Sequence, residues 1–251
     1  MPNGRLEGKR ALVTGAAGGL GAAIAARFVA DGARVLLGDV DRARGEQLAR
    51  DLGDRTVFVT LDVAAPPAWN KAMEIAATAW GGLDVLVNNA ALASPIVPIE
   101  QRDPADWDRM MAINLGGPFL GARAALPVFR AGGGGVIVNV SSVAGLGQSG
   151  IMDPAYACSK AGLTMLTRII AAQHARDGVR CNSVHPGPID TPLARATYAD
   201  TETLAQRLSR IPAGRFAQVE EVVAAIVYLA SEESAYVTGV ALGVDGGALV
   251  Q

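Results

Sequence analysis

The sequence predicts an α/β fold in which a seven-stranded parallel sheet is doubly wound, with helices on both faces. Short runs rich in Val, Leu and Ile alternate along the chain with longer segments of helical period. The apolar runs are nearly continuous, which is typical of parallel strands that are covered on both faces. The chain has 251 residues and is 50% hydrophobic, so it is long enough to bury such a sheet.

Each element follows from this alternation. The expected strands span residues 10–14, 34–39, 56–60, 83–88, 135–140, 179–184 and 240–244. The expected helices span about residues 19–31, 42–52, 67–80, 104–130, 155–176 and 219–231. Strand–helix alternation builds right-handed βαβ units, and these units place all strands parallel in one sheet.

The chain shows no internal repeat, low-complexity linker or domain boundary, so we expect one domain over residues 1–251. Residues 188–217 form a connection that is longer than a simple crossover requires. Long connections in compact domains often cover a binding site. We therefore expect this segment to be a lid on the substrate side.

Composition and charge exclude several classes of function. The net charge is −2, and no basic block indicates a nucleic-acid or membrane partner. Cys158 and Cys181 are too few for a disulfide framework and lack the spacing of a metal site. The first residues lack an apolar core of the kind that signal peptides carry, and no apolar run is long enough to span a bilayer. We expect a cytoplasmic protein without a metal site.

A glycine-rich turn, T-G-A-A-G-G-L-G at residues 14–21, follows the first strand and opens the first helix. Gly15, Gly19 and Gly21 allow the backbone to turn tightly and to approach a pyrophosphate, which the helix N-terminus then binds. Leu20 lies within the same turn. A glycine-rich turn that binds no ligand is the alternative interpretation.

The second strand ends in Asp39, whose carboxylate can accept hydrogen bonds from the hydroxyls of an adenosine ribose. Its neighbours Gly38 and Val40 are not basic, so a 2′-phosphate would meet a negative charge without a counter-ion. This favours NAD(H) over NADP(H) as the coenzyme. Asp41 is expected to cap the helix that begins at residue 42.

The third strand is followed by Asp62 and Val63, which we expect at the adenine end of the coenzyme. An N-cap role for Asp62 in the next helix is the alternative.

With these motifs in order, the chain resembles the short-chain dehydrogenase/reductase family, in its subgroup of similar length, and the resemblance covers the chain from end to end. It implies a single Rossmann-type domain and an NAD(H)-dependent oxidoreductase. The matching segments are T-G-A-A-G-G-L-G (14–21), N-N-A-A (88–91), Asn114, V-S-S-V-A-G (140–145), Y-A-C-S-K (156–160), H-P-G-P-I-D-T (185–191) and V-D-G-G (244–247).

Tyr156 and Lys160 are four residues apart and therefore lie on one helix face. An alcohol that gives up a hydride must also lose its hydroxyl proton. Tyrosine, with a pKa near 10, is a weak base, but a nearby ammonium and the nicotinamide cation favour its phenolate. We expect Tyr156 to be the general base in oxidation and the general acid in reduction. A solvated lysine beside a half-buried tyrosine is the alternative that an isolated pair would favour.

Two further residues complete the expected catalytic set. Ser142 follows the fifth strand, at the carboxyl end of the sheet, and its hydroxyl can bind the substrate oxygen. Asn114 resembles the family residue that holds a water in the proton relay; a buried asparagine that kinks its helix is the alternative. Lys160 is also expected to bind the nicotinamide ribose.

The resemblance assigns further residues to the coenzyme and to the substrate. The remaining coenzyme contacts are Asn88, Ala90, Pro186, Gly187, Ile189 and Thr191. The expected substrate contacts are Ser94, Ser142, Val143, Met152, Asp153, Tyr156 and Leu193. Most of the pocket is small or apolar, which predicts a small hydrophobic or cyclic secondary alcohol, with a hydroxysteroid among the candidates.

Two other functions remain open from the sequence. A 3-oxoacyl-(acyl-carrier-protein) reductase would be similar in sequence, although it would normally use NADPH. A non-catalytic dinucleotide sensor would usually lack the tyrosine or the lysine. The resemblance also implies a homotetramer, because the helices expected at 104–130 and 155–176 carry more apolar positions than one sheet face can cover.

Overall fold

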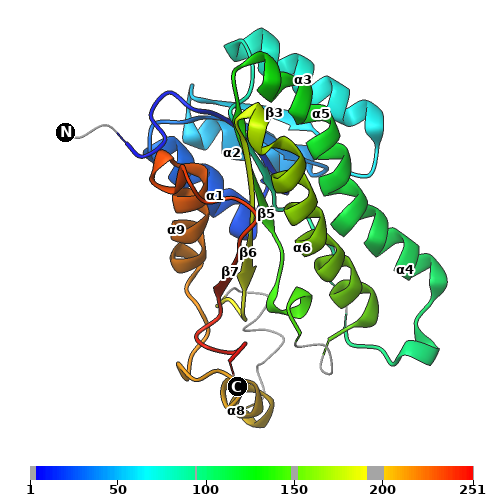
Figure 1. The fold of residues 1–251 in the computed structure, drawn as a ribbon. Coiled ribbons are helices and arrows are strands. Elements are labelled where there is room, and N and C mark those ends of the chain that lie inside the picture. Colours follow the sequence, from blue (N-terminus) through cyan, green and yellow to red (C-terminus); the bar gives the residue numbers. More distant parts are fainter. Residues whose placement is uncertain (1–3, 94, 148–151, 191–200, 251) are drawn as a thin grey trace.

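The computed structural model describes residues 4–93, 95–147, 152–190 and 201–250 (Figure 1). One sheet of seven parallel strands forms its centre, in the order β3-β2-β1-β4-β5-β6-β7. The strands are β1 (Arg10–Thr14), β2 (Arg34–Asp39), β3 (Thr56–Thr60), β4 (Val85–Asn88), β5 (Gly135–Val140), β6 (Val179–Pro186) and β7 (Ala241–Val244). The predicted fold class is confirmed.

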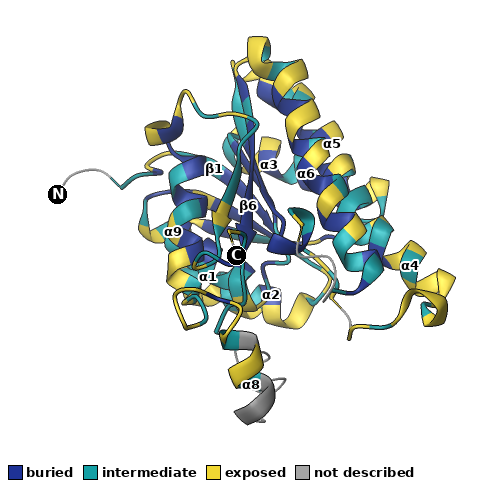
Figure 2. Cartoon of the chain, turned by 60° about the horizontal axis from the view of Figure 1, so that its bottom comes forward, coloured by how far each residue is buried: buried dark blue, intermediate teal, exposed yellow. Residues whose placement is uncertain are grey.

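Helices cover both faces of the sheet (Figures 1 and 2). They are α1 (Gly19–Ala30), α2 (Arg42–Leu52), α3 (Pro66–Trp80), α4 (Pro104–Met111), α5 (Gly117–Ala131), α6 (Pro154–His174), α8 (Thr201–Leu208) and α9 (Val219–Ala230). Alternate strand residues point to opposite faces. Val13 packs with Phe28 of α1 and Ile226 of α9, whereas Leu12 packs with Trp69 of α3 and Phe129 of α5. This double covering explains the continuous apolar runs of the strands.

Most element boundaries agree with the sequence prediction, and four strands match it in full. The predicted strand at 83–88 begins later, at Val85, because Asp84 forms an ion pair with Arg10 at the start of β1. The predicted strand at 179–184 continues to Pro186.

The prediction of one helix over 104–130 is wrong. A π-turn, Ala112–Gly116, separates α4 from α5, and the N–H of Gly117 donates to the carbonyl of Ala112, five residues earlier. Pro118, which has no N–H, follows at the start of α5 and limits regular helical bonding there. Single π-turns of this kind are frequent at functional sites, and this one contains Asn114.

The strand order reverses between β1 and β4, which creates a crevice at the carboxyl ends of the strands. Figure 1 shows α8 beyond the ends of β6 and β7, apart from the helices that cover the sheet. The expected lid, residues 188–217, contains α8, and a bridge between Ile189 and Ala217 joins its two ends. Residues 191–200 lie outside the described part. In the described ranges, no helix has the length and apolar character needed to cross a membrane.

Candidate active site

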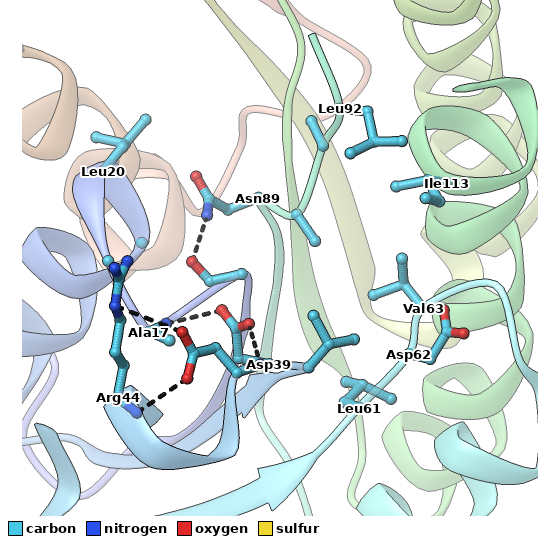
Figure 3. Close-up of a pocket in the computed structure, with 17 residues that line it drawn as sticks. Ala17, Leu20, Asp39, Arg44, Leu61, Asp62, Val63, Asn89, Leu92 and Ile113 are labelled. Atoms are coloured by element: carbon cyan, nitrogen blue, oxygen red, sulfur yellow. Dashed lines mark hydrogen bonds and ion pairs between the residues drawn. The ribbon is translucent and has the colours of Figure 1, made fainter. Parts of the chain in front are cut away.

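A cavity of about 420 Å³ lies in the crevice where the strand order reverses (Figure 3). Its lining comes from the glycine turn after β1, the end of β2, the loop after β3 and the loop after β4, together with Arg44 of α2 and Ile113 of the π-turn. Figure 3 shows Asp39 and Arg44 on one side of the cavity and Leu92 and Ile113 on the other. The residues of the four predicted coenzyme segments therefore meet in one place.

Two glycines permit the close packing of this turn. Gly15 has a φ of +65°, and a Cβ there would lie 2.8 Å from the Cα of Ala90. At Gly21 a Cβ would lie 2.0 Å from the carbonyl oxygen of Gly15. The side chain of Asn89 completes the contact, since its amide donates to the carbonyls of Thr14 and Gly15. Any larger residue at Gly21 would push the turn away from the start of α1.

Asp39 faces the cavity with both carboxylate oxygens held by main-chain donors. One oxygen accepts from the N–H of Ala17 at 2.8 Å, and the other accepts from the N–H of Asp41 at 3.0 Å. Each carboxylate oxygen has a further lone pair that can accept another hydrogen bond. The carboxylate is therefore fixed in position and still able to bind a pair of ribose hydroxyls.

A cation that the sequence analysis missed lies beside this carboxylate. Arg44, on the first turn of α2, lines the cavity, and its Nε is 3.4 Å from Asp41 Oδ2 (Figure 3). Asp41 also caps α2, as predicted, by accepting from the N–H of Arg44. Arg44 was overlooked because only the direct sequence neighbours of Asp39 were considered, whereas the first turn of the next helix returns to the strand end.

Most of the other residues predicted in these coenzyme segments also line the cavity. Leu20, Val63 and Ala90 do so directly, and Gly19 begins α1. Asp62 lines it as well, and its carboxylate accepts from the N–H of Ala64 at 2.9 Å. The cap residue of α3 is Ala65, so the alternative N-cap role of Asp62 is not found.

Asn88 is placed differently from the prediction, because its side chain does not point to the cavity. Its amide donates to Asn139 Oδ1 at 2.8 Å, and the residue is 3% exposed. These two residues are register partners on β4 and β5. The neighbouring Asn89 lines the cavity instead. In an N-N pair at a strand end, successive side chains face opposite directions, and the sequence does not indicate which one faces inward.

Taken together, these residues fit a dinucleotide. The N-cap residue of α1 is Gly18, which has no side chain. No side chain at this position therefore caps the N–H groups at the start of this helix. A phosphate group suits this position because helix N-termini attract anions. Asp39 supplies acceptors at the correct end for a ribose.

The predicted catalytic residues come from three elements: Ser142 follows β5, Tyr156 and Lys160 lie on α6, and Asn114 lies in the π-turn whose Ile113 lines the cavity. Ser142 follows β5 and caps a short helix, Val143–Gly145, with its Oγ accepting from the N–H of Ala144. Tyr156 lies on the first turn of α6. Burial raises the pKa of Tyr156, and the hydrogen bond from the Ser142 side chain partly opposes this rise. The neighbouring Ser141 points away and donates to the carbonyl of Lys160.

Lys160 is fully buried on the same face of α6, with Nζ 5.7 Å from the centre of the Tyr156 ring. Its Nζ donates to the carbonyl of Val140 at 2.8 Å. Burial lowers the pKa of Lys160 to about 8. The expected lowering of the pKa of Tyr156 by Lys160 is therefore absent in the chain alone, where burial of the phenol dominates.

Asn114 is 1% exposed, and its side chain forms hydrogen bonds with the backbone of Leu92. Its Oδ1 accepts from the N–H of Leu92 at 2.7 Å, and its Nδ2 donates to the Leu92 carbonyl at 2.9 Å and to Ser159 Oγ at 3.2 Å. Leu92 lines the cavity. Asn114 thus connects α6 to the loop after β4, and its side chain has a structural role that the water-relay prediction did not include.

Asp153, which the sequence analysis expects at the substrate, has two structural contacts in the chain alone. Its carboxylate caps α6 by accepting from the N–H of Tyr156 at 3.1 Å. It also forms a buried ion pair with Arg102 at 2.8 Å. This pair holds the loop before α4 against the first turn of the helix that carries Tyr156. No sequence pattern indicates this pair, because the two residues are 51 positions apart.

The other predicted positions are distributed around the ends of β5 and β6. Val143 is 2% exposed, and Met152 is half-buried directly before the cap of α6. Pro186 ends β6, and Gly187 donates to the carbonyl of Val244. Ile189 packs against the core next to α9. Ser94, Thr191 and Leu193 lie outside the described residues.

Among the described residues, no cluster of His, Cys, Asp and Glu could hold a metal ion. The phenol of Tyr156 has the Ser142 hydroxyl as a hydrogen-bond partner and the buried Lys160 ammonium 5.7 Å from its ring centre.

Comparison with known proteins agrees with this geometry. A family model described as enoyl-(acyl carrier protein) reductase matches residues 15–248. The chain is 40% identical to a 3-alpha-(or 20-beta)-hydroxysteroid dehydrogenase of Mycobacterium tuberculosis, over 98% of this chain and 91% of the relative. It is 42% identical to a cis-4-hydroxycyclohexanecarboxylate dehydrogenase of Sinomonas cyclohexanicum, over 94% and 95% of the two chains. It is also 38% identical to a 3-oxoacyl-(acyl-carrier-protein) reductase of Thermotoga maritima, over 98% and 100%.

The family match spans nearly the whole chain, and the relatives are similar to it at full length. The chain therefore belongs to the short-chain dehydrogenase/reductase family and is an oxidoreductase.

Proposed function

We propose that this protein is an NAD(H)-dependent oxidoreductase that interconverts a cyclic secondary alcohol and its ketone. The observation that carries the proposal is the hydrogen bond between Ser142 and Tyr156, in a fold whose crevice holds a cavity lined by Asp39. The phenol and the hydroxyl supply the proton chemistry of an alcohol, while the cavity suits the coenzyme.

The coenzyme, when bound, accepts a hydride from the carbinol carbon or returns it to the ketone carbon. The chain itself moves the proton. In reduction, the Tyr156 hydroxyl donates its proton to the substrate oxygen; in oxidation, the phenolate removes the proton from the alcohol. The Ser142 hydroxyl bonds to Tyr156 in the chain alone, and with substrate bound it donates to the same substrate oxygen, while its Oγ keeps the hydrogen bond from Ala144.

Burial of Tyr156 favours its neutral form and so suits the donor role in reduction. Oxidation requires the phenolate, which needs a positive charge nearby. Lys160, mostly protonated below its pKa of about 8, supplies that charge from the same helix face. We further propose that Lys160 binds the nicotinamide ribose, so that Lys160→Ala impairs both coenzyme binding and proton transfer.

The choice of NAD(H) rests on Asp39. Its fixed carboxylate accepts from ribose hydroxyls but repels a 2′-phosphate. Arg44 is the one cation among the described residues that line the cavity in Figure 3, and it forms an ion pair with Asp41, with Nε 3.4 Å from Oδ2.

A cyclic alcohol is the proposed substrate class. Two of the relatives are named for alcohols on a steroid or a cyclohexane ring. The test is the change in absorbance at the NADH band when the protein is mixed with NAD+ and cis-4-hydroxycyclohexanecarboxylate, a 3α-hydroxysteroid, an acyclic secondary alcohol or a 3-hydroxyacyl thioester. We expect turnover with a cyclic alcohol. Turnover with the acyclic alcohol alone would contradict the substrate class.

A second candidate, 3-oxoacyl-(acyl-carrier-protein) reductase, is favoured by the relative from Thermotoga maritima. It predicts oxidation of the 3-hydroxyacyl thioester with NADP+ as the hydride acceptor, which is measured by repeating the same assay with NADP+ in place of NAD+.

We also propose a cytoplasmic homotetramer of single-domain chains, with residues 188–217 as a lid over the substrate. Support comes from apolar side chains on α5 and α6, where Phe119, Met165 and Ile169 are 51%, 53% and 43% exposed. A second copy that packs on these helices would cover them. Sedimentation is expected to show four chains of 25.7 kDa each, and a stable monomer at micromolar concentration would contradict the assembly.

A further inference from the structure

His185 lies at the end of β6, next to the serine that we place in catalysis. It is completely buried, and both of its ring nitrogens have a partner at 2.8 Å. Nδ1 faces the main-chain carbonyl of Ser142, and Nε2 faces the hydroxyl of Ser183. The catalytic scheme above does not use this residue.

The position of the His185 ring follows from the way in which the pairing of β5 with β6 ends. The register of β5 and β6 ends at Val140 and Val184, and the N–H of Ser141 still donates to the carbonyl of Val184. The next residue but one on β6 is Pro186, which has no N–H to continue the ladder. The imidazole of His185 supplies a donor at this point, to the carbonyl of Ser142.

These contacts determine the tautomer. A carbonyl oxygen only accepts hydrogen bonds, so Nδ1 must carry the proton and donate it to Ser142. Nε2 then accepts from the hydroxyl of Ser183. Burial lowers the pKa of His185, in agreement with a neutral ring.

The carbonyl to which His185 donates is that of Ser142 itself, so this hydrogen bond constrains the main chain that orients the Ser142 side chain. The same carbonyl accepts from the N–H of Gly145, and the Ser142 Oγ accepts from the N–H of Ala144. The main chain of Ser142 is thus held from the side of β6 as well as from its own turn. Without the ring, the Ser142 carbonyl would keep only its bond from Gly145 among the described residues, and the main chain that carries the hydroxyl would lose its tie to β6 at this residue.

We propose that His185 is a positioning residue for catalysis: by donating from Nδ1 to the Ser142 carbonyl, it fixes the Ser142 hydroxyl against the substrate oxygen. This inference rests on the proposed role of Ser142 in that reaction. His185 itself touches neither the substrate nor the coenzyme in this account.

Two amide variants of His185 test the hydrogen bonds of its two ring nitrogens separately. In His185→Asn the amide nitrogen can take the place of Nδ1, so the bond to Ser142 is kept. In His185→Gln the longer side chain reaches the place of Nε2, so the bond to Ser183 is kept and the bond to Ser142 is lost. Both variants bury an amide of similar polarity, and Ser183 can donate to the carbonyl of Val240 when the ring is absent.

Turnover of cis-4-hydroxycyclohexanecarboxylate with NAD+ is the readout. His185→Gln is expected to lower kcat about 10- to 100-fold, the order expected when a catalytic group is misplaced by about an ångström. The KM for NAD+ should not change, because the coenzyme cavity is built from other segments. His185→Asn should retain kcat within about threefold of the wild type. In a Ser142→Ala background, His185→Gln should cause no further loss.

Equal loss in the Asn and Gln variants, or an undiminished effect of His185→Gln in the Ser142→Ala background, would overturn the inference. A second measurement needs no folded variant at position 185. Nitrogen-15 spectra of histidine-labelled wild type, assigned with a His174→Gln control, should show the Nδ1–H tautomer of His185. An Nε2–H tautomer would overturn this inference alone, whereas absence of alcohol turnover in the wild type would count against the proposed function.

Discussion

The two halves of the sheet build their parts of the site in different ways. In the half formed by β1, β2 and β3, the coenzyme cavity is made by short local motifs: a glycine turn and single acids at strand ends. In the half formed by β4 to β7, the catalytic residues are held by pairs that are distant in sequence. Asp153 pairs with Arg102 at the start of α6, and His185 holds Ser142, while Asn114 joins α6 to Leu92 in the loop after β4, which also lines the coenzyme cavity.

This difference has a physical cause. A phosphate or a ribose is bound by backbone geometry and by one acceptor, so a few adjacent residues suffice. Proton transfer requires a phenol and a hydroxyl aligned within a fraction of an ångström, and such alignment needs support from several elements. Variants in the first half should therefore change which coenzyme binds, and variants in the second half should change turnover with little effect on coenzyme binding.

The largest expected effect is in the catalytic half. Tyr156→Phe removes only the proton donor and should lower kcat at least ~10³-fold, because general acid–base catalysis contributes about that much. NADH affinity, measured by fluorescence titration, should stay within about twofold. Tyr236→Phe, at a fully exposed tyrosine, is the matched control and should behave as the wild type. If Tyr156→Phe kept a tenth of the wild-type kcat, Tyr156 would not be the acid and base.

The next largest effect is expected in the coenzyme half, from Asp39→Ser, which removes the carboxylate proposed to face the ribose. Charge-assisted hydrogen bonds contribute about 1.5–3 kcal/mol, and the repulsion of a 2′-phosphate adds to the preference for NAD+. We expect the ratio of kcat/KM for NAD+ over NADP+ to exceed about 10² in the wild type and to collapse in the variant. Asp54→Ser, at an exposed position on the surface, should leave the ratio unchanged. An unchanged ratio in Asp39→Ser would remove Asp39 from the coenzyme site.

The burial of Lys160 predicts a pH dependence of stability. Its pKa falls from 10.5 in the unfolded chain to about 8 in the folded chain. Between these values the unfolded state binds more protons, so the free energy of unfolding rises as pH increases from about 8 to 10.5. The destabilising contribution is fully present below pH 8 and corresponds to about 3 kcal/mol.

Lys160→Met isolates this contribution, because methionine has no titrating group. The free energy of unfolding of the wild type minus that of Lys160→Met should rise by about 3 kcal/mol from pH 7 to 10.5, measured by denaturation in the absence of coenzyme. The exposed Lys71→Met is the control and should show no such trend. A difference that falls with pH would mean that the ammonium is stabilised by its site.

The smallest expected effect returns to the coenzyme half. Asp41→Asn keeps an N-cap residue on α2 but removes the charge that engages Arg44. Exposed ion pairs contribute about 0–1 kcal/mol, so kcat/KM for NADP+ should rise at most about fivefold. Glu46→Gln, which breaks the pair with Arg42 on the same helix, should have no effect. A decrease for NADP+ in Asp41→Asn would show that Arg44 does not face the 2′-position.

The sequence predicted the architecture well for a physical reason. Strands that are buried on both faces are apolar without interruption, so their ends are visible in the composition. It failed at the helix expected over 104–130, because a π-turn depends on one shifted hydrogen bond that periodicity does not reveal.

The candidate site was predictable to the extent that a residue acts by its type and its place on a strand end. Asp39, Gly15 and Gly21 are of this kind. The bond of Asn88 to Asn139, the pair of Asp153 with Arg102 and the place of Arg44 at the cavity were not predicted, because they depend on where a side chain points or on contacts that distant segments bring together. His185 could not be assigned from sequence, since its contact with the Ser142 carbonyl depends on how β5 and β6 pair.

The central claim is that one hydride moves between a cyclic carbinol carbon and NAD(H). It is tested most directly with cis-4-hydroxycyclohexanecarboxylate that carries deuterium on the carbinol carbon, incubated with the wild-type protein and NAD+. Mass spectrometry of the coenzyme should show reduced NAD that contains a single deuterium, formed together with the ketone. Reduced coenzyme without deuterium, or ketone formed without reduced coenzyme, would contradict the claim.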